Sequence, residues 1–379
     1  MKRRAALGLL TAAPLLGACR SAPPRDRGDT SAPGLVLESA VLLVEPLGAT
    51  WKTPDPFLFC AHHDDAYPAG NGKLGPDASL TGRQLGSDFA PEEAWRMYHG
   101  NPIPGFPQHP HRGFETVTVV RRGLVDHADS LGAAARYGEG DVQWLTAGKG
   151  IVHAEMFPLL DVGAPNPLEL FQIWLNLPAA DKMVEPHFSM LWSPSIPRQA
   201  ILDSAGKATK LTIVAGGLGG NRAPDPPPKS WAARPDSDVA IWTLEMPPGG
   251  RFTLPRAQAS SNRRLYFYRG KSLRVGALDV ASGHFVDLRA DSAVTIENGP
   301  EPSGLLMLQG QPIAEPVARR GPFVMNTAAE IDKAYADYRA TRFGGWPWPK
   351  DGPVHDLEGR FARHASGRTE RGTLPHVTW

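Results

Sequence analysis

Two pairs of possible metal ligands stand in short, well separated motifs. His109 and His111 lie in H-P-H-R-G-F-E, and His153 and Glu155 lie in G-K-G-I-V-H-A-E. A single residue separates the members of each pair, and alternate residues of a β-strand face the same side. Imidazole nitrogens and a carboxylate oxygen are groups that bind divalent transition metals. We therefore predict that two strand segments hold one metal ion, although a lone His-x-His motif would equally suit a solvated sheet face.

The elements that must position these side chains are expected to be strands joined by many turns. The chain has 379 residues, among them 40 Gly and 38 Pro, and this turn-rich composition favours a mostly β protein. Its length suggests two domains of ordinary size or one large domain. Gly148 and Gly150 lie just upstream of the second ligand pair and permit a tight turn or a close backbone approach. The 40 basic and 39 acidic residues leave a net charge of +1, so we expect no nucleic-acid partner.

The N-terminus has the pattern of an export signal. M-K-R-R precedes an apolar run from Ala5 to Leu16, and L-G-A-C ends at Cys19. This segment resembles a bacterial lipoprotein signal in which Cys19 carries the lipid, with an ordinary cleaved signal as the alternative. We expect residues 1–36 to be signal peptide and tether. The protein would then be exported, either periplasmic or held at the membrane only by its lipid; whether the arginine pair directs twin-arginine export stays open.

Several segments after the tether predict strands. T-V-T-V-V-R-R-G-L-V-D-H, L-E-L-F-Q-I-W-L-N-L-P and R-R-L-Y-F-Y-R-G are apolar or alternating runs bounded by turn residues, a pattern typical of sandwiches and barrels. Two such series follow one another, so the architecture is expected to be duplicated. By contrast, residues 60–105 are rich in turn formers and lack a sustained period.

One helix is expected near the C-terminus. Thr327 and Glu330 have the spacing of a capping box. The residues with helical i, i+3, i+4, i+7 spacing are Ile331, Ala334, Tyr335 and Tyr338. Gly344 or Gly345 is expected to end this helix in the left-handed conformation.

Five motifs together resemble the pirin family of the cupin superfamily. They are H-P-H-R-G-F-E-T-V-T, G-D-V-Q-W-L-T-A-G-K-G-I-V-H-A-E-M, L-F-Q-I-W-L-N-L-P, D-K-M-V-E-P and G-P-F-V-M-N-T. The resemblance implies an all-β bicupin with two antiparallel, jelly-roll type barrels face to face and a C-terminal helix. We accordingly expect a metal-binding cupin over residues 37–195, a metal-free cupin over residues 196–320, and the helix and tail over residues 321–379.

The resemblance also implies the ligand set. The positions that match the pirin metal ligands are His109, His111, His153 and Glu155. The metal in such proteins is typically iron, which makes Fe²⁺ the expected ion, but Mn, Ni, Cu and Zn suit the same ligands. Glu115 is the alternative carboxylate, because many cupins use the acid that follows their His-x-His pair. We expect it to orient or support the site instead.

Other residues near these motifs have weaker signals. Three apolar neighbours of the ligands are candidate pocket residues, each also suited to the core: Phe106, Phe114 and Met156. His62 and His63 precede Asp64 and Asp65 and resemble a ligand cluster, but they could equally well form a polar loop at the barrel mouth. His127 is expected at a strand edge.

The function implied by the resemblance is ring-opening dioxygenation of a flavonol such as quercetin. Its partners would be a small aromatic substrate and dioxygen, and the protein is expected to be a monomer. Glu155 would be the catalytic base that takes the flavonol proton. The main alternative is a non-catalytic, metal-dependent redox sensor or interaction protein. An isomerase or hydrolase remains a third hypothesis, because the cupin fold does not determine the chemistry.

Overall fold

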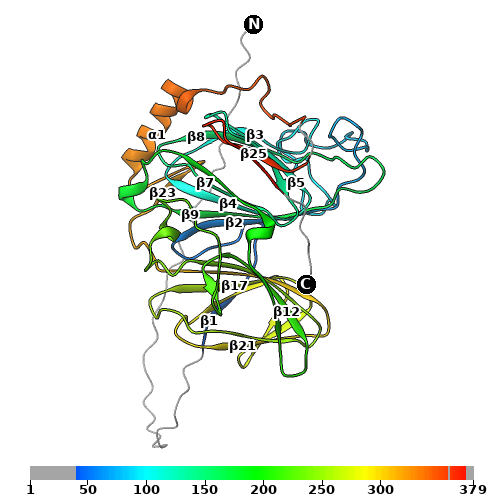
Figure 1. Cartoon of the computed structure of the whole chain (residues 1–379), viewed down its shortest axis with the longest axis vertical. Coiled ribbons are helices and arrows are strands. Elements are labelled where there is room, and N and C mark those ends of the chain that lie inside the picture. The colour runs from blue at the N-terminus through cyan, green and yellow to red at the C-terminus, as the bar shows by residue number, and fades with distance from the viewer. Residues whose placement is uncertain (1–39, 357–358, 373–379) are drawn as a thin grey trace, which may run out of the picture. The chain divides into compact units, whose positions relative to one another are not determined.

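The computed structural model describes residues 40–356 and 359–372, and most of its regular structure is β-strand (Figure 1). Residues 1–36 and Cys19, for which the sequence predicts a signal peptide, a tether and a lipid attachment site, lie outside the described residues. Within the described ranges, no helix combines the length and apolar character needed to cross a membrane.

The first barrel is built from two antiparallel sheets with an apolar interior. The strand orders are β10-β7-β4-β9-β2 and β26-β25-β6-β5-β8-β3. The bounds are β2 (Phe57–Asp65), β3 (Gly105–His111), β4 (Phe114–Arg122), β5 (Leu124–Asp129), β6 (Ala134–Gly138), β7 (Val142–Thr146), β8 (Ile151–Met156), β9 (Leu168–Asn176), β10 (His187–Leu191), β25 (Phe361–Arg363) and β26 (Thr369–Arg371). Side chains from both sheets, such as Val125, Leu145 and Leu170, form one buried cluster. Burial of these alternating apolar residues closes the barrel.

The second barrel repeats this plan with sheets of seven and four strands. Their orders are β1-β20-β17-β22-β15-β12-β11 and β16-β21-β18-β19. The bounds are β1 (Val41–Pro46), β11 (Arg198–Leu202), β12 (Ala208–Ala215), β15 (Ala240–Met246), β16 (Arg251–Leu254), β17 (Asn262–Arg269), β18 (Ser272–Val275), β19 (Leu278–Ala281), β20 (His284–Leu288), β21 (Val294–Asn298) and β22 (Ser303–Gly310). Buried apolar side chains, among them Leu244, Leu265 and Met307, fill its interior.

A third apolar cluster joins the two barrels. Phe171 from the first barrel and Tyr266 and Leu306 from the second are fully buried in it together with Trp51. The Trp51 and Tyr266 rings stack with centroids 5.1 Å apart. The expected all-β bicupin is therefore confirmed, with a continuous core between the barrels.

The remaining short elements connect or flank the barrels. They are β13 (Gly217–Leu218), β14 (Asn221–Arg222), β23 (Ala318–Arg320), β24 (Phe323–Met325), η1 (Ala179–Asp181), η2 (Ser193–Ser195), η3 (Trp231–Ala233) and η4 (Arg342–Gly344). Residues 66–104 hold only isolated bridges, and the excursion begins after β2 rather than at residue 60.

The first strand belongs to the second barrel, which corrects the expected boundary at residue 37. β1 pairs antiparallel with β20, from Val41 opposite Leu288 to Pro46 opposite His284. The alternation of the sequence predicts a strand here but contains no information about its partner, because any open sheet edge offers the same backbone groups.

The C-terminal tail returns to the first barrel. Phe361 of β25 lies opposite Arg136 of β6 and is only 1% exposed. The tail therefore covers a sheet edge and adds apolar side chains to the barrel.

Replacing Phe361 by alanine is expected to lower the free energy of unfolding by about 3 kcal/mol, because it removes a buried aromatic side chain and leaves a cavity. Arg363 lies on the same strand but is exposed, so Arg363→Ala should change stability by less than about 0.5 kcal/mol. Denaturant titration of both variants measures the difference. Equal stabilities would mean that the tail does not contribute to the core.

The predicted helix is confirmed as α1 (Ala328–Thr341), including its capping box between Thr327 and Glu330. Its end differs from the prediction, because Arg342 (φ 53°) takes the left-handed position rather than Gly344 or Gly345. A tertiary contact accounts for this early turn. The Arg342–Gly344 segment places the Phe343 ring against Gly150, where a Cβ would lie 2.6 Å from the ring.

Candidate metal centre

Two paired strands bring the predicted ligands together. In the antiparallel ladder of β3 and β8, His109 lies directly opposite His153, and a bulge separates this pair from Phe106 opposite Glu155. Directly opposed residues of antiparallel strands have neighbouring side chains. His111, two residues after His109, faces the same side. The pairing of β3 with β8 thus brings the histidines of the two motifs into a single cluster.

The three imidazoles form a compact group. Their ring centroids lie 4.8 Å (His109 to His111), 4.5 Å (His109 to His153) and 4.9 Å (His111 to His153) apart. One ligand nitrogen from each ring lies within 4.8 Å of the others. Burial lowers the pKa of His109 to about 4, and it also lowers the pKa values of His111 and His153. Neutral imidazoles are the form that binds metal.

The free ring nitrogens fit a metal ligand role. His109 Nδ1 lies 2.9 Å from the carbonyl oxygen of Pro107, and His111 Nδ1 lies 3.4 Å from that of Pro322. These contacts leave each Nε2 available as a ligand. Both ring nitrogens of His153 are buried and lack a hydrogen-bond partner among the described residues. Such unpaired buried groups are costly, and a bound ion would satisfy them, so the group suggests a metal site.

Glu155 lies at the edge of this group. Its Oε2 atom is 3.9 Å from His153 Nε2 and accepts a hydrogen bond of 2.7 Å from Gln172 Nε2. Thr118 Oγ1 lies 3.1 Å from Oε1. Burial raises the pKa of the Glu155 carboxyl, opposed by nearby His127 and by these hydrogen bonds. Its roles as fourth ligand and as base stay predictions.

Glu115 lies in a different environment. It is fully buried on β4, where its carboxylate accepts hydrogen bonds from Thr146 Oγ1 and from Ser230 Oγ, which precedes the second barrel's η3. Burial raises its pKa to about 7, although the two hydroxyl donors oppose the rise. Glu115 thus connects segments of both barrels.

The stability of the protein should depend on pH through Glu115. Below the unfolded pKa of 4.5, the folded and unfolded states both hold the proton, so Glu115→Gln should have little pH-dependent effect there. Between pH 4.5 and 7 only the unfolded state ionises, and the wild type should lose up to about 3 kcal/mol relative to Glu115→Gln. Denaturant titrations across this range measure the divergence. A constant difference would contradict a raised pKa at this site.

A large cavity opens beside the three-histidine group. Its volume is about 890 Å³, within the usual range for sites that bind small molecules. The ligand candidates that line it are His109, His111 and Glu155. Its aromatic wall consists of Phe59, Phe89, Tyr98, Phe106, Phe157 and Trp174. The cavity therefore places candidate metal ligands beside a largely aromatic wall.

The three candidate pocket residues have different positions. Phe106 lines the cavity, as the sequence suggested. Phe114 is fully buried behind the ligands, with its ring 5.1 Å from that of His111 and 4.2 Å from that of Trp174. Met156 is 3% exposed and packs against Gly352 of the tail. The last two support the site without lining the cavity.

The minor histidines lie elsewhere than predicted. His62 and His63 belong to β2 rather than to a loop. His127 lies inside the sheet rather than at an edge, because β5 pairs with both β6 and β8, and it is fully buried opposite Glu155. The polar residues that follow His63 concealed the strand of that histidine pair. For His127 the sequence indicates a strand but not its place in the sheet, because strand pairing depends on residues distant in sequence.

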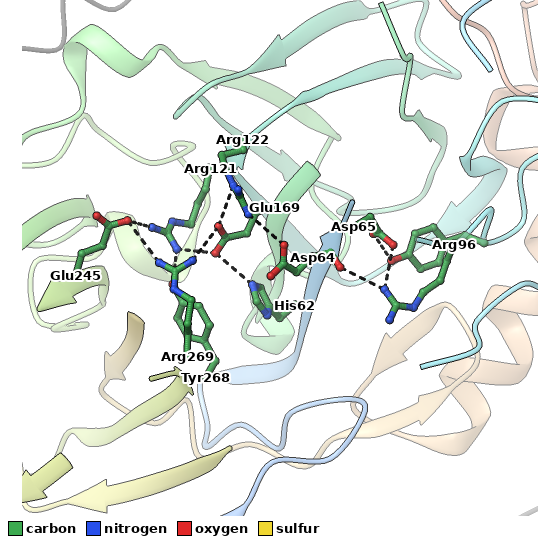
Figure 2. Close-up of polar contacts among 11 residues, drawn as sticks. His62, Asp64, Asp65, Arg96, Arg121, Arg122, Glu169, Glu245, Tyr268 and Arg269 are labelled. Atoms are coloured by element: carbon green, nitrogen blue, oxygen red, sulfur yellow. Dashed lines mark hydrogen bonds and ion pairs between the residues drawn. The ribbon is translucent and has the colours of Figure 1, made fainter. Parts of the chain in front are cut away.

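The excursion over residues 66–104 forms one wall of the cavity. It contributes Phe89, Tyr98 and His99. Arg96 anchors it to β2 by donating to Asp65 Oδ1 (3.0 Å) and to the Asp64 carbonyl (3.3 Å), as Figure 2 shows. This segment is thus an integral part of the cavity.

Thr118, Gln172 and Trp174 line the cavity but were not among the predicted site residues. Gln172 holds Glu155, and Trp174 contacts the His111 ring at 5.3 Å. A lone Gln in the otherwise apolar run L-F-Q-I-W-L is the signal that would have identified the first of them, since an unpaired polar group on a buried strand is rare.

Comparisons with known proteins agree with this architecture. Residues 48–175 match the family described as Pirin, and residues 241–344 match the Pirin C-terminal cupin domain. A Pseudomonas aeruginosa protein provisionally named quercetin 2,3-dioxygenase is 37% identical over 260 residues, which is 68% of this chain and 82% of that protein. Human pirin is 32% identical over 253 residues, or 65% of this chain and 80% of pirin.

A solved structure is similar over most of the described chain. The crystal structure of quercetin 2,3-dioxygenase from Acinetobacter baumannii aligns with a TM-score of 0.63 and 25% sequence identity. The alignment covers 80% of this chain and 98% of the Acinetobacter chain.

Proposed function

Since this chain belongs to the pirin family, we propose that it is a metal-dependent dioxygenase that opens the ring of a flavonol such as quercetin. The observation that carries the proposal is the combination of three clustered imidazoles, two of them buried, with an aromatic cavity of about 890 Å³. A flavonol is flat and apolar, with an adjacent hydroxyl and carbonyl that can chelate a metal. The names of the Pseudomonas and Acinetobacter relatives support the same reaction class.

The metal would be held by His109, His111 and His153, with Glu155 as the fourth ligand. Their three neutral nitrogens and one carboxylate suit Fe²⁺, and also Mn, Ni, Cu or Zn. The ion would supply Lewis acidity and open coordination positions for the substrate and dioxygen. The ring nitrogens of His153, which form no hydrogen bond to any residue that the structure describes, support this assignment.

The chain's own residues would bind the substrate and move its proton. The rings of Phe106, Phe157 and Trp174 form apolar walls against which a flat aromatic molecule can stack. Gln172 and Thr118 fix the orientation of the Glu155 carboxylate. A Glu155 oxygen would then accept the flavonol hydroxyl proton, and its burial raises the pKa of the carboxyl toward that task.

The direct test is a single reaction with defined metal content. Purified protein is loaded with ferrous ion without oxygen, desalted, mixed with quercetin and exposed to air. Loss of the flavonol absorption together with release of carbon monoxide supports the proposal. Metal-free protein and ferrous ion alone serve as controls, because free iron can oxidise quercetin by other routes. Binding of quercetin without turnover would instead favour a sensor or binding protein.

A further inference from the structure

Paired residues of the neighbouring strands β2 and β9 line one side of the cavity. Phe59, Ala61 and His63 are alternate residues of β2, and all three line the cavity. Their partners on β9 are Trp174, Gln172 and Leu170, respectively. Trp174 contacts the ring of His111, and Gln172 binds Glu155. Phe59 is therefore near the level of His111, and Ala61 is near the level of Glu155. His63 is two residues further along β2, a step of about 7 Å, so it lies beyond Glu155 on the side away from His111.

The His63 ring is polar, faces the cavity and has no polar partner. Its neighbours are the rings of Tyr98, Phe106 and Phe157, with centroids 4.7, 5.8 and 6.4 Å away. No hydrogen bond to either ring nitrogen occurs within residues 40–356 and 359–372. Burial, with the nearby His62 and Arg96, lowers its pKa to about 3. A neutral imidazole offers one donor and one acceptor.

The other polar groups at this end of the cavity have partners in the protein. Tyr98 donates its hydroxyl proton to Asp65 Oδ2 at 2.8 Å, and the guanidinium of Arg96 is bound to Asp65 and to backbone carbonyls. His99 Nδ1 contacts the Gly86 carbonyl at 2.6 Å. His62 also lines the cavity, and its Nε2 lies 3.4 Å from Glu169 (Figure 2). Asp64, a further lining residue, accepts a hydrogen bond of 3.2 Å from Arg122. His63 is therefore the polar group at this end that is best able to bind a ligand.

We propose that His63 is a specificity-determining residue that hydrogen bonds a ring hydroxyl of the flavonol at the end of the cavity away from the three histidines. This inference rests on the proposed function, because it takes the flavonol hydroxyl and carbonyl to lie at the metal end. The site then prefers a flavonol with further hydroxyl groups on its outer rings. The apolar rings around His63 strengthen the preference, because a hydroxyl placed there without a partner would lose its hydrogen bonds to water.

The test compares equilibrium binding of two flavonols to ferrous-loaded full-length protein without oxygen. Quercetin has hydroxyls on its outer rings, whereas 3-hydroxyflavone keeps only the hydroxyl next to the carbonyl. Wild-type protein should bind quercetin more tightly. His63→Phe keeps an aromatic ring but no polar atom, so it should weaken quercetin binding by about tenfold and leave 3-hydroxyflavone binding nearly unchanged. His63→Gln should restore part of the quercetin preference.

Phe157→Leu is the matched control, because Phe157 contacts the same ring and lines the same wall. It removes only apolar contact and should weaken the binding of both flavonols alike. If wild-type protein binds neither flavonol, the proposed function fails and this inference with it. If wild-type protein binds both and His63→Phe alters their affinities equally or not at all, the inference is wrong while the proposed function stands.

Discussion

Replacing His153 by alanine is expected to remove most of the bound metal and to abolish flavonol oxidation. The residue is fully buried and lies directly opposite His109. Its two ring nitrogens have no hydrogen-bond partner within the described part of the chain. Loss of a residue that only supports a metal ligand typically weakens metal binding by roughly 10- to 100-fold. Loss of His153, a ligand itself, should weaken metal binding by more than that. Elemental analysis after anaerobic loading and desalting measures the metal content. Thermal unfolding adds a second readout, since bound metal stabilises the folded state of the wild type.

The variant needs a control for general damage to the fold. His187→Ala alters an exposed histidine of the same barrel and should keep the full metal content and the metal-dependent rise in melting temperature. His109→Ala tests the same site by a second substitution. His109 is less buried than His153, so its replacement should disturb the fold less. Full metal content in both site variants, with unchanged activity, would refute the three-histidine site and the functional proposal that depends on it.

Glu155→Gln is expected to reduce kcat/KM for quercetin by about 10²- to 10⁴-fold, the usual contribution of a general base. The amide has nearly the same shape as the carboxylate but cannot accept the substrate proton. Gln172 and Thr118 lie within hydrogen-bond distance of its position, so the side chain should keep its place. Activity is measured at equal metal content, which separates proton transfer from loss of a ligand.

Glu115→Gln is the matched control for this experiment. It makes the same chemical change four positions after His111, but at a carboxylate bound to Thr146 and Ser230 rather than at the cavity wall. Its activity should stay close to that of the wild type. Activity of Glu155→Gln within about fivefold of the wild type would exclude Glu155 as a base of the expected strength.

The sequence by itself determined the features that depend on local spacing. The one-residue gap in each ligand pair predicts a shared strand face, and β3 and β8 bring the three histidines together. The capping box at Thr327 predicts a helix that begins at Ala328. These features need only the strand and helix periods, which neighbouring residues set.

The tertiary structure decided which distant segments meet. The partner of β1 is a strand of the second barrel, β25 covers the first, and the Arg342–Gly344 turn ends α1 by placing Phe343 on Gly150. The excursion has no period of its own, yet its Tyr98 and Arg96 are held by Asp65 and complete the cavity around His63. A local pattern determines which way a side chain faces within its own strand. What that side chain faces depends on burial and pairing across the whole chain, so only the folded structure reveals it.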